Sequence, residues 1–406
     1  MIDASARPDD YDALADDSNE GVYSTYEMLR ASRPVAWSNA WNGFWSLMSY
    51  EDVARVASDY RTFINSVQNV VPKVAFTGRR PPLHLDPPAH TPFRLVLNPL
   101  LSERRIAVLE PTIRRLCGEL LAPLIEQGEC DICEDFSSRL PVNVFAEWMR
   151  IPSDMAAPLR QAGRAFNVAV QSNIDSVVKE TSLALYAMAR ELIALRKREP
   201  MDPMLDPTAA LLAARHEGDA LPEELIIGCV RQVLVVGIIA PTVLIGSIGV
   251  HLSRDVALQQ QLRTNPQLIP AALEEFLRLY TPYRGFARTA RHDVQIRGCP
   301  IKQGEPIALN YASANRDAAV FESPDQFILH RPNIGQSLAF GRGPHHCPGA
   351  ALARLELTVA LQELLARTSR FDVIGPITPT RMPELGVLSV RMRFTPASER
   401  SLMDGA

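Results

Sequence analysis

The chain lacks the features that would place it outside the cell, in a membrane or on nucleic acid. Residues 1–19 contain no basic segment followed by an apolar run, so we expect no secretory signal. The formal net charge is -4 with 22% charged residues, which favours neither nucleic acid nor an anionic membrane as a partner. With no secretory signal expected, the six cysteines do not indicate a disulfide framework, and the sequence is typical of a cytoplasmic protein.

Two cysteines, Cys130 and Cys133, have the C-x-x-C spacing of a redox pair or of half a zinc site. No second C-x-x-C or histidine pair lies at zinc spacing, and no thioredoxin-like unit surrounds them. We therefore expect two small, half-buried residues on a strand-like segment.

The segment from Val233 to Val250 carries no charge and is long enough to span a membrane. It contains glycines and Pro241, however, and has no aromatic flanks. We therefore expect no membrane span. One long helix, from Leu225 to His251, is predicted to run through the middle of a large core.

The rest of the chain shows mostly helical periodicity, with no internal repeat and no low-complexity linker. The predicted fold is mainly α with a small β part, in one domain over residues 1–406. The β-richer parts are expected at about 33–49 and 294–310, and the helical core at about 102–279 and 348–367.

The most informative motif is the stretch of ten residues from Phe340 to Gly349, which reads FGRGPHHCPG. Its glycines allow a tight loop whose backbone can approach a flat cofactor closely. Cys347 lies at the start of the last predicted helix, where exposed N–H groups stabilise a thiolate, and Phe340 is placed to shield the sulfur from water. A zinc site built on His345, His346 and Cys347 is the alternative, but adjacent residues chelate one tetrahedral ion poorly.

This motif resembles the haem loop of the cytochrome P450 family, F-G-x-G-x-H-x-C-x-G, at every defined position. The resemblance implies a helical fold around a buried haem b whose iron is ligated by Cys347. It extends by identifiable motifs from about Arg94 to Glu356.

Other segments carry the same resemblance. Glu275 and Arg278 look like the family's E-x-x-R, whose spacing puts both side chains on one helical face. A buried pair of this kind needs further hydrogen bonds, and the resemblance implies Arg331 as the third member of this structural group.

The resemblance also supplies the expected ligands of the two haem propionates. His90 and Arg94 match the family's H-x-x-x-R, and Arg288 matches an arginine that precedes the next strands. With His345, these residues are the positive donors that two carboxylates require. Phe340, Cys347 and Gly349 complete the expected cofactor-binding set.

The chain departs from the family in its long apolar helix. Where the family has an acid and an alcohol that relay protons, this sequence has Ile239 and Ala240. Thr242 is two residues from the alcohol position, which is the wrong helical face. Pro241 has no N–H to donate to the carbonyl of Gly237, so we expect a kink that leaves this carbonyl free. A water would then be held by Gly237 together with Thr242 or a polar group of the substrate. A simple kink with poor coupling is the alternative.

The resemblance implies a monooxygenase that inserts one oxygen atom of O2 into a small apolar or aromatic substrate. Electrons would come from a ferredoxin and its reductase, docking on a monomer at a basic patch formed by Arg104, Arg105, Arg114, Arg115 and Arg342. The same arginines could equally be scattered, solvated charges. The candidate pocket residues are Val236, Ile239, Ala240, Arg284 and Phe286.

Arg284 has two interpretations, as the partner of an anionic substrate or, more in keeping with base rates, as a surface or structural residue. Two alternative functions remain open at this point. One is a peroxide-driven or otherwise atypical haem-thiolate oxidase that lacks the proton relay, and the other is a non-catalytic haem-binding protein.

Overall fold

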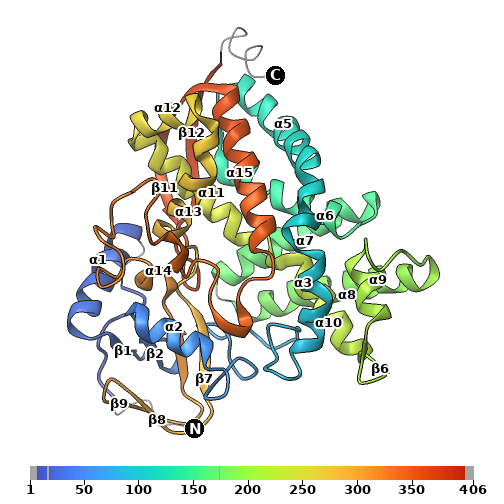
Figure 1. Cartoon of the computed structure of the whole chain (residues 1–406), viewed down its shortest axis with the longest axis vertical. Helices are drawn as coiled ribbons and strands as arrows, with labels where there is room; N and C mark the ends of the chain where they lie inside the picture. The colour runs from blue at the N-terminus through green and yellow to red at the C-terminus, as the bar shows by residue number, and fades with distance from the viewer. Residues whose placement is uncertain (1–6, 16–17, 173, 398–406) are drawn as a thin grey trace.

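The computed structural model of the protein describes residues 7–15, 18–172 and 174–397. Helices dominate it, and Figure 1 shows a smaller β-rich part at the lower left, beside α1 and α2. The mainly α fold with a small β part is therefore confirmed. The α-helices are α1 (Asn19–Ser32), α2 (Tyr50–Ser58), α3 (Thr91–Leu100), α4 (Glu103–Ile106), α5 (Glu110–Gln127), α6 (Leu140–Trp148), α7 (Ser153–Ser172), α8 (Asp175–Arg198), α9 (Pro207–Ala213), α10 (Glu223–Val236), α11 (Ile239–Arg254), α12 (Val256–Thr264), α13 (Ile269–Leu279), α14 (Tyr311–Ala314) and α15 (Ala350–Arg367).

Short helical turns connect several of these elements. The 3-10 turns are η2 (Ala40–Asn42), η3 (Ala107–Leu109), η5 (Pro266–Leu268), η6 (Ile334–Gln336) and η7 (Gly343–His345), and η4 (Ile132–Ser137) is a π-helix.

The strands form one larger sheet and several small ones. The five-stranded sheet has the order β1-β2-β10-β7-β3, a three-stranded sheet has the order β11-β12-β4, and β5-β6 and β8-β9 are two-stranded. The strands are β1 (Val35–Ser38), β2 (Phe44–Leu47), β3 (Phe63–Ile64), β4 (Glu129–Asp131), β5 (Arg215–His216), β6 (Asp219–Ala220), β7 (Phe286–Ala290), β8 (Val294–Ile296), β9 (Cys299–Ile301), β10 (Pro306–Leu309), β11 (Thr368–Pro379) and β12 (Val387–Pro396).

Both predicted β regions contain strands, but β3, β4, β5, β6, β7, β11 and β12 lie outside them. β1 and β2 pair across the turn at 40–43, and β8 to β10 fall within 294–310. The C-terminal strand β12 pairs with β11 and also, through Arg391–Arg393, with β4 in the middle of the chain. This sheet was missed because its third strand comes from a segment about 260 residues away.

The long apolar helix is correctly placed in the core but is not continuous. It consists of α10 and α11, which are separated at Gly237 and Ile238. The span Glu223–Arg254 is apolar enough to cross a membrane, yet 83% of its most apolar part is buried within the fold. The prediction of one uninterrupted helix from Leu225 to His251 was wrong, but the expected kink is present. The break at Gly237 and Ile238 lies four and three residues before Pro241, where the proline ring clashes with the helix and its missing N–H leaves the Gly237 carbonyl without a helical donor.

The prediction for Cys130 and Cys133 needs correction. Cys130 is in β4, but Cys133 lies in the π-helix η4, and both side chains are fully buried rather than half-buried. Burial raises the pKa of the Cys130 thiol to about 12 and raises that of Cys133 as well. Two neutral, buried thiols of this kind act as small apolar residues.

Candidate active site

The loop from Phe340 to Gly349 has the tight geometry that its glycines predict. Gly341 and Gly343 have φ values of +70° and +74°, a region that residues with a Cβ rarely adopt. A Cβ on Gly343 would lie 2.7 Å from the carbonyl oxygen of Ala57, so the loop packs directly against the end of α2. The amide of Cys347 donates to the Phe340 carbonyl at 2.9 Å, which closes the loop just before α15 begins at Ala350.

The thiol of Cys347 is in a site that does not by itself produce a thiolate. Burial raises its pKa, and the amide of Gly349 and the charges of Arg94 and Arg354 offset only part of that rise. The helix terminus, which we expected to stabilise the thiolate, begins only three residues later. A bound metal cation is what would remove this proton, because coordination deprotonates a thiol outright.

Phe340 lies beside this loop but faces another partner. Its ring stacks against the guanidinium of Arg354, 4.5 Å from the ring centroid, and lies 6.5 Å from the ring of His346. Its carbonyl, rather than its ring, makes the hydrogen bond to Cys347. Shielding of the sulfur by Phe340 therefore stays a prediction.

Four predicted donors, His90, Arg94, Arg288 and His345, come together from three separate segments. The rings of His90 and His345 lie 4.8 Å apart, and the Nε2 atom of His90 contacts the Pro344 carbonyl at 3.0 Å. Burial, followed by the charges of Arg288, His90 and Arg94, lowers the pKa of His345 to about 2. Burial also lowers the pKa of Arg94, and the nearby Cys347 partly restores it.

This cluster has unused hydrogen-bonding capacity. The Nδ1 atom of His90 and the Nε2 atom of His345 are buried and have no hydrogen-bond partner in the described part of the chain. Within the same residues no ion pair joins Arg94 or Arg288 to a carboxylate, although Asp86 lies near enough to raise the pKa of Arg288. Two arginines without paired carboxylates, beside two histidines with free ring nitrogens, fit a ligand that brings its own two carboxylates, as the haem propionates do.

The break between α10 and α11 presents one accessible face inside an otherwise buried span. The side chain of Val236 is 49% exposed, and Ile239 and Ala240 are half-buried, whereas their neighbours Val235 and Val243 are fully buried. Spacings of three and four residues put the first three on one face. These three accessible side chains carry neither an acid nor an alcohol, and their role as pocket residues stays a prediction.

Gly237 and Thr242 are on other sides of this span. A Cβ on Gly237 would lie 1.8 Å from the ring of Phe145 in α6, so packing alone explains this glycine. The Thr242 hydroxyl is buried and contacts the carbonyls of Ile238 and Ser137 at 2.7 and 2.9 Å. The Ser137 hydroxyl in turn donates to the Thr242 carbonyl. The Thr242 hydroxyl is thus directed at η4 and its own helix, and proton delivery by Thr242 stays a prediction.

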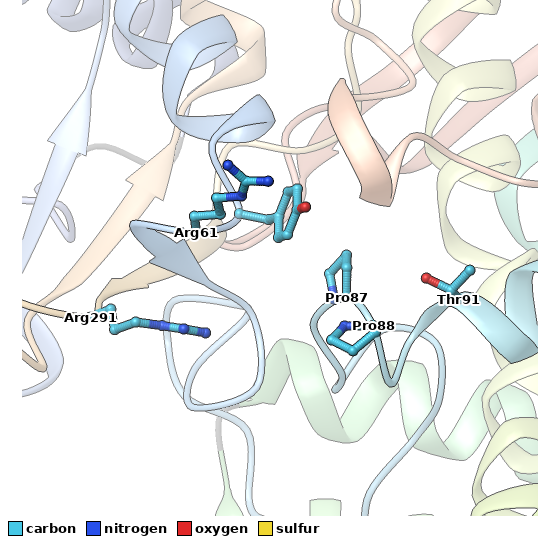
Figure 2. A pocket seen from close by; sticks show the side chains of 6 residues that line it. Arg61, Pro87, Pro88, Thr91 and Arg291 are labelled. Atoms are coloured by element: carbon cyan, nitrogen blue, oxygen red, sulfur yellow. The ribbon is translucent and has the colours of Figure 1, made fainter.

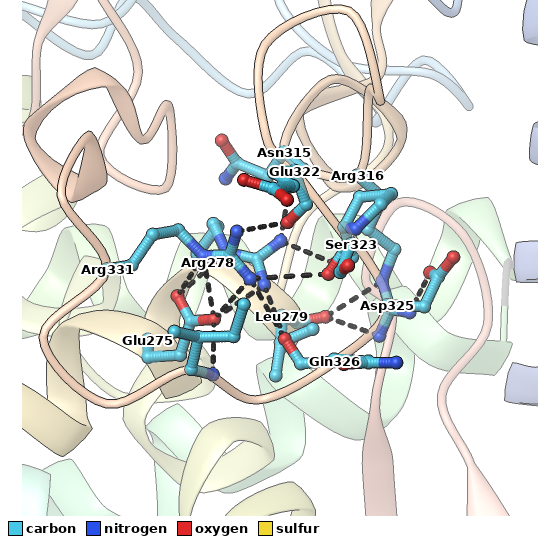
Figure 3. Close-up of polar contacts among 12 residues, drawn as sticks. Glu275, Arg278, Leu279, Asn315, Arg316, Glu322, Ser323, Asp325, Gln326 and Arg331 are labelled. Atoms are coloured by element: carbon cyan, nitrogen blue, oxygen red, sulfur yellow. Dashed lines mark hydrogen bonds and ion pairs between the residues drawn. The ribbon is translucent and has the colours of Figure 1, made fainter.

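The predicted structural group is present in full, as Figure 3 shows. Arg278 makes two hydrogen bonds to the Glu275 carboxylate at 2.7 and 2.8 Å, and the Nε atom of Arg331 donates to the same carboxylate at 2.9 Å. All three side chains are buried. Arg278 also donates to the carbonyls of Asn315 and Pro324, so the group ties α13 to the irregular segment before the cysteine loop.

The two remaining pocket candidates differ in surroundings. Phe286 begins β7 and packs against Tyr283, with ring centroids 4.5 Å apart. Arg284 is buried, and its Nε atom donates to the carbonyl of Glu384 at 2.9 Å. Its charge also acts on the phenol of Tyr11, whose pKa is raised mainly by burial. These contacts support the structural interpretation of Arg284.

A separate pocket of about 460 Å³ opens beside the start of α3. Figure 2 shows Arg61 and Arg291 on one side of it, with Pro87, Pro88 and Thr91 on the other. Since it lies next to His90, the N-cap of α3, it borders the cationic cluster without containing any of the predicted site residues.

Comparison with known proteins identifies the family. The family model for cytochrome P450 matches residues 248–389. The putative cytochrome P450 YjiB of Bacillus subtilis is 31% identical over 378 residues, which cover 91% of this chain and 93% of that protein. The chain belongs to the cytochrome P450 family. The mycinamicin IV hydroxylase/epoxidase of Micromonospora griseorubida is 33% identical over 350 residues, which cover 84% of this P450 and 86% of that protein.

Solved structures agree with this assignment. The cytochrome P450 CYP109Q5 of Chondromyces apiculatus superposes with a TM-score of 0.86 at 27% identity, covering 96% of this chain and 99% of that one. A mutant of P450 EryK in complex with erythromycin B superposes with a TM-score of 0.83 at 28% identity, covering 94% and 97%. This P450 is therefore an oxidoreductase of the bacterial monooxygenase family, and its cofactor is haem b.

Proposed function

We propose that this P450 inserts one oxygen atom of O2 into a small organic substrate, with Cys347 as the iron ligand. The observation that supports this most is the half-buried Cys347, whose loop also contributes His345 to the cluster with His90, Arg94 and Arg288. In this proposal His90, Arg94, Arg288 and His345 hold the propionates. Haem b supplies the binding and reduction of dioxygen, which a thiolate ligand favours by donating electron density to the iron.

Exchanging Cys347 for serine tests the proposal. The Cys347→Ser variant should lose the red-shifted absorbance of the reduced, carbon monoxide-bound protein that marks a thiolate ligand, together with substrate oxidation. Cys299→Ser, which changes a partly exposed thiol in β9, is the matched control and should change neither. An unchanged carbon monoxide spectrum in Cys347→Ser would contradict the assignment.

The protein's part in the reaction is to position the substrate and control water. Val236, Ile239 and Ala240 form the accessible apolar face of the α10–α11 break and favour a substrate with an apolar or aromatic body. We infer that a water held by the Gly237 carbonyl delivers protons, because Pro241 has no N–H to donate to it and Ile239 and Ala240 have no acidic or hydroxyl group.

This inference predicts the effect of restoring the alcohol. If ordered water suffices, Ala240→Thr should not lower the hydrogen peroxide released per NADH consumed. Ala240→Val, which has the same branching without a hydroxyl, is the control. A Thr variant that is much better coupled than the Val variant would show that the parent lacks an efficient relay.

A second candidate function, oxidation driven by peroxide, is favoured by the same feature. Hydrogen peroxide already carries the two electrons and two protons that O2 would have to receive. An enzyme that uses peroxide therefore needs less proton delivery from an acid–alcohol pair. Comparing product formed with peroxide against product formed with ferredoxin, reductase and NADH separates the two functions. A peroxide rate that exceeds the electron-driven rate at saturating ferredoxin would favour the second.

For the electron donor we propose an acidic ferredoxin that docks on the face around the cysteine loop. The five arginines expected there are not equivalent, because Arg114 pairs with Glu110 and Glu363, and Arg115 pairs with Glu119. Arg104 and Arg342 are exposed and are the stronger contributors to a positive patch.

Salt and charge reversal test this docking face. Arg342→Glu should slow reduction of the haem by ferredoxin severalfold at low ionic strength, and the difference should shrink as salt is added. Arg115→Glu is the control, with a smaller effect expected because Glu119 already neutralises Arg115. Equal rates for Arg342→Glu and the parent would place the docking face elsewhere. We further propose a cytoplasmic monomer with a single domain over residues 1–406.

A further inference from the structure

Arg231, in the middle of α10, is a fully buried cation. Its Nη2 atom donates to the hydroxyl of Ser182 in α8 at 2.8 Å, and its guanidinium lies 4.5 Å from the ring centroid of Phe166. Its Nε and Nη1 atoms are buried and have no hydrogen-bond partner in the described residues. A buried guanidinium whose donors are unused is unfavourable unless an anion completes it.

A second buried arginine, Arg80, lies in the segment that crosses the same helix. The carbonyl of Arg79 packs against Gly228, where a Cβ would be only 1.9 Å away, one turn before Arg231. Arg80 donates to the Nε2 atom of His84 at 2.9 Å, and its own Nε has no partner among the described residues. Because His84 accepts this bond, it is neutral and cannot balance the charge.

The two arginines act on each other and on His84. Burial lowers the pKa of Arg231 to about 9, with a further contribution from Arg80, and burial lowers that of Arg80 to about 10. Burial and the charges of Arg80 and Arg231 lower the pKa of His84 to about 3. At neutral pH both arginines are therefore charged and His84 is not. Across residues 18–172 and 174–397, no carboxylate forms an ion pair with either arginine.

Arg80 also lines a small cavity of about 30 Å³ under the loop at 65–76. That volume suits a few water molecules or one small charged group. Its walls include amide, hydroxyl, ammonium, guanidinium, imidazole and apolar groups but no carboxylate. The lining residues are Asn65, Ser66, Val67, Gln68, Asn69, Val70, Lys73, Val74, Phe76, Arg80 and His84. Val70, in the cavity wall, forms a β-bridge with Phe286, the first residue of β7, two residues before Arg288.

We propose that the substrate is a carboxylic acid whose carboxylate is bound by Arg80, with Arg231 behind it as the second positive charge. This inference rests on the proposed function, since it names the substrate class of the same site. The apolar body of the acid would face Val70, Val74 and Phe286, and Arg231 is a positioning residue rather than a catalytic one.

Paired ligands test the proposal on the unmodified holoenzyme. Each acid is compared with its uncharged amide, 4-ethylbenzoate with 4-ethylbenzamide and decanoate with decanamide. The readouts are the spin-state shift of the haem spectrum and the rise in melting temperature. We expect at least one acid to bind 30-fold or more tightly than its amide. Equal affinities, or no binding of any acid in either readout, would overturn the proposal.

Variants separate a binding role from a structural one. Arg80→Gln should reduce the preference for acid over amide to threefold or less, and Arg80→Lys, which keeps the charge, should retain part of it. Arg231→Met should weaken acid binding and raise the melting temperature of the ligand-free protein, because an uncompensated charge is removed. Arg190→Met, a mostly exposed cation beside Tyr186, is the matched control and should change neither.

The outcomes distinguish this proposal from the proposed function. If Arg231→Met lowers the melting temperature and leaves the acid preference unchanged, the arginines are structural and the proposal fails. The carbon monoxide spectrum reports the thiolate independently, so an enzyme with that spectrum and no acid preference would still be a P450 monooxygenase. If a carboxylic acid raises the melting temperature but the thiolate spectrum is absent, the anion site is supported and the proposed oxygen chemistry is rejected.

Discussion

The carboxylate of Glu275 offers the most direct test of how buried charge holds this P450 together. It accepts hydrogen bonds from Arg278, from Arg331 and, at 3.0 Å, from the amide of Ile328. The Glu275→Gln substitution keeps the shape but removes the negative charge, and it turns one acceptor into a donor that faces guanidinium donors. Removing one partner of a buried charge pair destabilises a protein by about 3–5 kcal/mol, so we expect the free energy of unfolding to fall by that amount.

The chain supplies a matched control one residue away. Glu274 pairs with Arg354 at the surface, where the two side chains are 29% and 42% exposed. An ion pair at this exposure contributes about 0–1 kcal/mol, so Glu274→Gln should be nearly neutral. Urea unfolding of both holo variants, followed by far-ultraviolet circular dichroism, measures the difference. If the free energy of unfolding falls no more in Glu275→Gln than in Glu274→Gln, the buried network does not stabilise the fold.

Three further predictions concern close packing and one buried acid. The Gly237→Ala variant should have a free energy of unfolding, measured in urea, about 1–3 kcal/mol lower than the parent, because its Cβ would overlap Phe145. Adding Phe145→Leu should recover part of that stability. No recovery would show that this contact is not the cause. Gly343→Ala should speed haem loss to apomyoglobin, since the residue has positive φ and its Cβ would meet the Ala57 carbonyl; an unchanged rate would count against this. Burial raises the pKa of Glu356 from 4.5 to about 8, so the folded state binds a proton that the unfolded state releases between those values. Stability should therefore fall as pH rises from 5 to 8, by up to about 4 kcal/mol at about 1.4 kcal/mol per pH unit, and Glu356→Gln should remove that slope.

The parts of the site that sequence predicted are those carried by short, local spacing. The cysteine loop is continuous in sequence, and Glu275 and Arg278 are one helical turn apart, so their arrangement follows from the pattern. Arg331 was added from the family resemblance, in keeping with the need of a buried pair for further hydrogen bonds. The gathering of His90, Arg94 and Arg288 came from the family resemblance, since nothing in the local sequence brings these segments together.

The parts that sequence missed depend on contacts between distant segments. The break at Gly237 lies four residues before Pro241 and could be expected from that proline, but the packing of Phe145 from α6 against Gly237 could not. The direction of the Thr242 hydroxyl depends on a carbonyl in η4, about a hundred residues earlier. Arg80 and Arg231 are about 150 residues apart. The only available signal was a lone arginine two positions before the uncharged stretch that begins at Val233.

The pairing of β12 with β4 has a consequence for how the protein is made. Residues 129–131 are hydrogen-bonded to residues 391–393, so this sheet cannot close until residues 391–393 have been synthesised. The cysteine loop at 340–349 is likewise made after the apolar α10–α11 segment. The three-stranded sheet and the cysteine loop therefore form later in synthesis than the helices at 223–254, because long-range contacts must wait for both partners.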